Sequence, residues 1–133
     1  GTAYGPITLN MTGIGSLGTL TSTTGAISAT SSLKGLSFTT LKAGTGITLR
    51  AAANMGLGLN PAFAIIGTNL DAGTGAVDAQ ATTGNVQIGK LVAASASTVK
   101  ALSGNLKITT VTLPATIGLT ASATGTRSLP IGF

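Results

Sequence analysis

An eight-residue pattern occurs twice in this sequence, at a spacing of twenty residues. Gly84–Leu91 reads GNVQIGKL and Gly104–Val111 reads GNLKITTV, so both follow the pattern Gly-Asn-apolar-polar-Ile-x-x-apolar. Gly-Asn is typical of a turn, and the alternation of apolar and polar residues after it predicts a short strand with one buried face. A strand that recurs at a fixed period predicts that successive turns of the chain stack on one another.

The period of twenty extends toward the start of the chain. Ile7, Ile27 and Ile47 are each twenty residues apart and each begins an alternating segment. After the interruption described next, Val77 resumes the pattern and Val99 continues it. We therefore expect these five residues to form one inward-facing ladder.

The period slips once. The segment Leu41–Gly46 (LKAGTG) recurs as Leu70–Gly75 (LDAGTG) after twenty-nine residues rather than twenty. We place the surplus of nine in an irregular excursion at residues 55–67, which contains Asn60-Pro61. Together with the regular repeats, this predicts a single all-β domain over residues 1–133, with about six coils of about twenty residues and a length on the order of 30 Å.

Composition favours strands. Hydrophobic residues make up 43% of the chain, but aromatic residues only 3% and charged residues only 7%. The apolar residues are mainly Ala, Val, Ile and Leu, and the strong helix formers Glu, Gln, Lys and Arg are scarce. The predicted core is thus built from small repeated contacts, and the expected core residues are Ile27, Ile47, Val77, Val99, Val86, Ile88, Leu106 and Ile108.

The residues that carry most enzyme chemistry are missing. The sequence has no His, Cys or Glu, which excludes Ser-His-Asp and Cys-His catalysis and ordinary zinc sites. Its two carboxylates, Asp71 and Asp78, are the minimum number for a glycosidase pair and supply few of the oxygen ligands that calcium needs. We expect both to be ordinary exposed residues. We predict no enzyme activity, no cofactor and no metal.

The charge distribution and the hydropathy argue against nucleic-acid binding and against a membrane span. The net charge is +5, but the seven basic residues are spread along the chain and lack the interleaved aromatics of a nucleic-acid site. The most apolar stretch, Met55–Ile66, is too short and too interrupted to span a membrane. We expect neither a nucleic-acid partner nor a membrane span.

The repeats Gly75–Ala79 (GAVDA) and Gly84–Ala93 (GNVQIGKLVA) resemble the repeats of filamentous-haemagglutinin-type exoproteins, the secreted adhesins of two-partner secretion. The resemblance covers residues 22–50 and 70–112, about half of the chain; the excursion and the short length depart from the family. It implies a right-handed parallel β-helix that serves at the cell surface as a stalk or adhesive fibre. The expected protein is extracellular and structural, a subunit or segment of a self-assembling, pilus-like filament or adhesin.

A β-sandwich with strand exchange between subunits fits the same alternating strands. In either architecture an open edge templates association, and few charges are present to prevent it. We therefore predict self-association through residues 5–12, with Ile7, Leu9 and Met11 as subunit contacts. The host or cell surface is a further possible partner, and the alternative functions are a carbohydrate- or surface-binding module and a viral or phage coat or fibre subunit.

Three asparagines carry further predictions. Asn10-Met11-Thr12 is a glycosylation sequon, so Asn10 is a candidate glycan site if the protein is exported. Asn85 and Asn105 stand at matching positions of the two octads. If the coils stack, we expect their amides to form a hydrogen-bonded ladder along the rod, whereas two independent Gly-Asn turns are the alternative.

Overall fold

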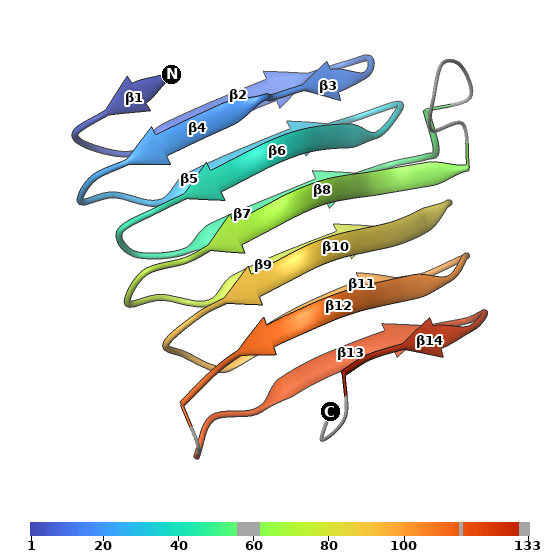
Figure 1. Ribbon diagram of the computed structural model, residues 1–133. Coiled ribbons are helices and arrows are strands. Elements are labelled where there is room, and N and C mark those ends of the chain that lie inside the picture. Colours follow the sequence, from blue (N-terminus) through green and yellow to red (C-terminus); the bar gives the residue numbers. More distant parts are fainter. Residues whose placement is uncertain (56–61, 115, 131–133) are drawn as a thin grey trace.

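The chain folds into two parallel β-sheets that face each other across one core (Figure 1). The structure is a computed structural model that describes residues 1–55, 62–114 and 116–130. Sheet A contains β1 (Thr2–Ala3), β3 (Gly15–Ser16), β4 (Thr19–Ser22), β6 (Leu36–Lys42), β8 (Phe63–Asp71), β10 (Asn85–Val92), β12 (Leu106–Thr112) and β14 (Arg127–Ser128). Sheet B contains β2 (Ile7–Met11), β5 (Ile27–Ser31), β7 (Ile47–Ala51), β9 (Val77–Ala81), β11 (Ser97–Ala101) and β13 (Leu119–Ala123).

The strands alternate between the sheets along the chain, so each coil contributes one segment to sheet A and one to sheet B. In Figure 1 the strands of sheet A point to the left and those of sheet B to the right, while the chain descends. This course is a right-handed β-solenoid of about six turns, the usual hand for parallel strands joined by a crossover. The β-helix prediction is confirmed. The β-sandwich alternative is wrong, because neighbouring strands pair in parallel, as in β10 with β12.

The twenty-residue period is the register of the stack. Ile7 pairs with Ile27 and Ile27 with Ile47, and Val86 pairs with Leu106. All eight residues predicted for the core are buried. One member of the predicted ladder is misplaced, because Val99 pairs with Ala79.

The ladder position after Val77 belongs to Ser97. The Ser97 hydroxyl accepts a hydrogen bond from the Val77 backbone N–H at 3.0 Å and donates one to the Ser95 carbonyl at 3.0 Å. Its buried polar atom is therefore satisfied, and a serine takes an inward position that the apolar pattern assigned to an aliphatic residue. Val99 fills the next inward position of β11.

The excursion is shorter than predicted. β8 begins at Phe63, so residues 63–67 belong to a strand, and the pairing of β8 with β10 shifts register at its start, where Ala64 is an extra buried residue. Such a bulge absorbs one residue of the surplus. The Asn60-Pro61 pair lies outside the described residues.

Glycines at the corners let the coils approach closely. Gly73 has a φ of 60°, and a Cβ there would lie 2.5 Å from the Ala43 carbonyl oxygen. At Gly75 a Cβ would overlap the Thr45 carbonyl. The two Gly-Thr-Gly segments are therefore turns whose backbones stack one coil above another.

Candidate interaction surface at the ends of the rod

The two ends of the solenoid leave strands with one unpaired edge. In the described part of the chain, β2 pairs only with β5 at the first end of sheet B, and β13 pairs only with β11 at the other end. In sheet A, β1 covers β4 but not the neighbouring β3, so that edge is stepped. The longest continuous edge at the N-terminal end is therefore β2.

The side chains of β2 alternate about this edge. Ile7, Leu9 and Met11 are partly buried and pack against the end of the core, while Thr8 and Asn10 are exposed on the outer face of sheet B. The predicted subunit contacts thus lie at an end of the rod, and Asn10, the candidate glycan site, is accessible. Subunit contact and glycosylation both stay predictions.

The backbone of β2 has a free set of hydrogen-bonding groups. The Ile7 N–H donates to Ala26 at 2.9 Å, and the Met11 carbonyl accepts from Ser32 at 2.8 Å, so these peptide groups face β5. Successive residues of a strand direct their peptide groups to opposite sides, and those of Thr8 and Asn10 therefore face outward. These are the groups that template the addition of another strand.

The N-terminal end carries apolar surface and no charged side chain. Tyr4 is 68% exposed and Ile14 is 46% exposed, and both belong to the first coil. No Asp, Glu, Lys or Arg precedes Lys34 in the sequence. No charged side chain in residues 1–33 therefore repels a second strand, although such charges are the usual protection of an edge.

The C-terminal end is closed by an arginine. Arg127 pairs with Leu106 and so continues the column of Ile65, Val86 and Leu106 at the end of the rod, where it is exposed. Its Nη1 donates to the Ala121 carbonyl at 2.7 Å.

That carbonyl belongs to the free edge of β13. The Ser97 N–H donates to Gly118, and the Thr124 N–H donates to Ala101, so Thr120 and Ser122 direct their peptide groups toward β11. The peptide groups of Ala121 therefore face outward, and the guanidinium occupies the central acceptor of this edge. Arg127 was not among the residues predicted from the sequence, although its signal was present: Gly125-Thr126-Arg127 follows Gly104-Asn105-Leu106 after twenty-one residues.

The asparagine ladder exists, with a different donor than expected. The Asn85 Oδ1 accepts from the Asn105 backbone N–H at 2.9 Å, and the Asn105 Oδ1 accepts from the Thr126 backbone N–H at 2.8 Å. Each amide therefore bonds to the backbone of the next coil rather than to another amide. The ladder ties the last three coils together at one corner.

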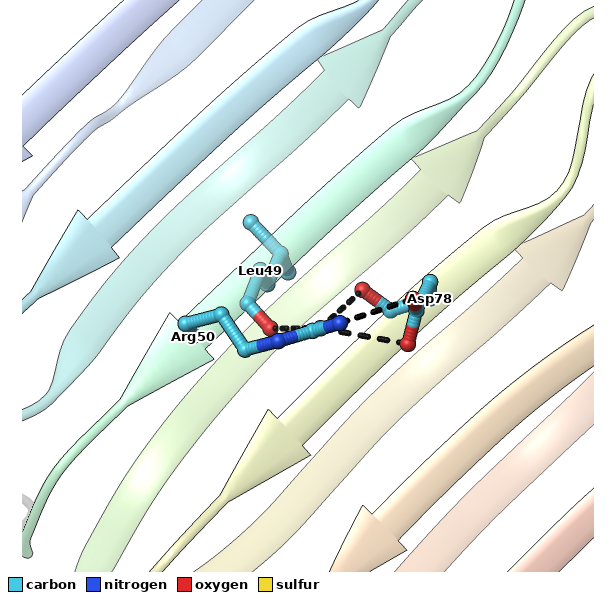
Figure 2. A network of polar contacts seen from close by, with 3 residues as sticks. All are labelled: Leu49, Arg50 and Asp78. Atoms are coloured by element: carbon cyan, nitrogen blue, oxygen red, sulfur yellow. Dashed lines mark hydrogen bonds and ion pairs between the residues drawn. The ribbon is translucent and has the colours of Figure 1, made fainter.

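The two carboxylates lie in different sheets and hold structural contacts. Asp71 ends β8 and accepts a hydrogen bond from the Gly73 N–H at 3.0 Å, which fixes the following turn. Asp78, in β9, forms an ion pair with Arg50 in β7, with the Arg50 Nη2 2.8 Å from the Asp78 Oδ2 (Figure 2). The Arg50 Nη1 also donates to the Asp78 Oδ1 at 3.1 Å and to the Leu49 carbonyl at 3.0 Å. This arrangement joins two coils and offers no pair of carboxylates around a substrate.

An open groove of about 400 Å³ lies on the outer face of sheet A and crosses several coils. Phe38 packs over Gly67, where a Cβ would overlap the phenyl ring, and glycine therefore shapes the groove. No residue of the lining is charged, and Phe38 and Ile66 are its large apolar members. The lining comprises Ser16, Gly18, Ser37, Phe38, Thr39, Ile66, Gly67, Thr68, Gln87 and Gly89. Such a surface is suited to neutral, hydroxyl-rich ligands.

The part of the chain that the structure describes contains no metal-ligand cluster and no helical membrane span. No group of three or more His, Cys, Asp or Glu side chains comes together there. Within residues 1–55, 62–114 and 116–130, no helix has the length and apolar character needed to cross a membrane.

In comparisons with protein-family models, curated proteins and solved structures, none matched this chain.

Proposed function

We propose that this protein is a non-enzymatic structural element of an extracellular fibre or adhesin, in which the rod self-associates through an open end. The observation that carries this proposal is the free edge of β2, beside the partly buried Ile7, Leu9 and Met11. Unpaired edges of this kind associate unless charge, proline or a bulge prevents it.

The arrangement of the buried residues and of the two carboxylates supports a structural role. The buried residues form continuous columns along the rod, and both carboxylates are engaged in contacts within the stack. A rod of this kind provides length and stiffness without requiring a catalytic centre. We place it at the cell surface on the resemblance to secreted adhesin repeats.

Sedimentation velocity combined with negative-stain electron microscopy tests the proposal. Self-association is expected to increase with protein concentration, and electron micrographs are expected to show rods joined along their long axis. Monodisperse single rods at the highest attainable concentration would contradict it.

The groove of sheet A supports a second candidate function, recognition of neutral carbohydrate. Its hydroxyl and amide groups provide hydrogen-bond donors and acceptors. Phe38 is the one aromatic residue in the lining. Binding of the isolated protein to a glycan array, lost on Gln87→Ala substitution with an unchanged fold, is the expected result. The matched control is Gln80→Ala, because Gln80 lies in β9 of the other sheet, away from the groove.

A further inference from the structure

We infer that the partner at the N-terminal end is a second copy of this chain in the opposite orientation, so that two β2 strands pair antiparallel about a two-fold axis. The inference rests on the proposed function, because it specifies how the rod self-associates. It follows from the unequal chemistry of the two ends.

Head-to-tail stacking is disfavoured by Arg127. In such a stack the C-terminal end of one rod would meet the N-terminal end of the next, and the Arg127 guanidinium would face Ile7, Leu9 and Met11. The charge would lose water without gaining a carboxylate, since no acidic residue precedes Asp71. An unpaired buried charge of this kind is strongly unfavourable.

Two N-terminal ends meet without that cost. Both are free of charged side chains, and the Gly1 ammonium of each is exposed and donates to the Thr19 carbonyl at 2.7 Å. Each end covers the half-exposed core residues of the other. A contact of one patch with itself closes after two copies, because a two-fold interface is isologous.

The peptide groups of β2 specify the register. Thr8 and Asn10 direct their N–H and carbonyl groups outward, as shown above. In an antiparallel pair, a directly opposed hydrogen-bonded pair exchanges both bonds. If Thr8 lies opposite the partner's Asn10, then Asn10 lies opposite the partner's Thr8, and all the outward groups of both residues are satisfied. Leu9 then faces the partner's Leu9 on the inner side.

Cysteine cross-linking tests this register directly, because the sequence contains no native cysteine. Opposed residues of a hydrogen-bonded antiparallel pair lie about 5.5 Å apart at Cα, within the range of a disulfide. Under mild oxidation, an equimolar mixture of the Thr8→Cys and Asn10→Cys proteins is expected to form a disulfide dimer at least about ten times faster than either protein alone. Both side chains are exposed, so near-native circular dichroism is expected for each variant.

The control pair is Thr98→Cys with Lys100→Cys, which occupies the same face of β11, a strand paired on both sides, and is expected not to cross-link. Preferential cross-linking of Thr8→Cys with Thr120→Cys would mean head-to-tail stacking and would overturn this inference, while leaving the proposed self-association intact. Dimers in sedimentation without the Thr8–Asn10 cross-link would also overturn it. Monomers in sedimentation together with no cross-link would overturn the inference and the proposed function alike.

Discussion

The two ends of the rod terminate the same repeat with different chemistry. At the N-terminal end β2 presents free peptide groups beside uncharged surface, whereas at the C-terminal end Arg127 donates to the Ala121 carbonyl on the free edge of β13. Both ends contain half-exposed core residues, so apolar exposure does not distinguish them. At the C-terminal end, one arginine thus engages a backbone acceptor of the kind that β2 leaves free at the other end.

A charge in the middle of the stack gives the largest expected effect and supplies the reference for both ends. Val86 is 1% exposed, and Val86→Asp places a carboxylate between Ile65 and Leu106. We expect a loss of at least about 4 kcal/mol in the free energy of unfolding, or no folded protein. Leu9→Asp at the open end is expected to cost about 1–2 kcal/mol and to prevent association. Urea denaturation measures both, and an equal cost would show that the end is not open.

Substituting alanine for a corner glycine compares the packing of the central coils with that of the last coil. A Cβ at Gly75 would overlap the Thr45 carbonyl, whereas at Gly118 it meets nothing within 4 Å. Gly75→Ala is expected to reduce the free energy of unfolding by about 1–3 kcal/mol, and the matched Gly118→Ala by less than about 0.5 kcal/mol. Thermal and urea unfolding test the pair. Similar losses in both would contradict the close packing assigned to the central corners.

Removing the arginine is expected to make the two ends alike. Arg127→Leu frees the Ala121 carbonyl and replaces the exposed charge at the end of the column with an apolar side chain, so the C-terminal end gains a pairing edge. Species larger than a dimer are expected in sedimentation velocity, with an affinity gain of at least about tenfold at that end, or about 1.4 kcal/mol. Arg127→Lys retains the charge and is the control. Assembly by Arg127→Lys to the same extent would show that the charge is not what closes the end.

The smallest expected effect concerns the Arg50–Asp78 pair, which is remote from both ends. Its side chains are 38% and 49% exposed, so solvent screens the attraction despite the two-point geometry. A double-mutant cycle with Arg50→Met and Asp78→Asn is expected to give a coupling energy of about 0.5–1 kcal/mol, decreasing in 1 M salt. Neither variant is expected to change association. A change in association would mean that the ends are coupled to the middle.

The fold was predictable from sequence because the repeat is also the hydrogen-bonding register. Apolar residues at a constant spacing must share a column when coils stack, which correctly identified Val86, Leu106 and their neighbours. The inward position of Ser97 was not predicted, because a buried hydroxyl with two hydrogen-bond partners stands there in place of an aliphatic residue and leaves no apolar signal. The predicted excursion also extended into residues 63–67, because a bulge at Ala64 breaks the alternation within a strand.

The candidate surface was predictable only in part. The alternation at Ile7–Met11 identified a strand suited to subunit contact, but no local pattern shows that β2 is the edge of its sheet. That property depends on what stacks beside it. The role of Arg127 required the column position, the carbonyl of Ala121 and the end of the stack to be known together.

The nine-residue slip has a consequence for how the molecule folds. Most neighbouring strands in sheet B are about twenty residues apart in sequence, but Ile47 and Val77, which pair across β7 and β9, are thirty apart. Closing the longer loop costs about 0.4 kcal/mol more, and zippering of coils from either side is expected to slow at this step. The Arg50–Asp78 pair spans the same two strands and contributes a free energy of similar size. The free energy of the ion pair is therefore large enough to offset the cost of closing the longer loop at the interruption of the repeat.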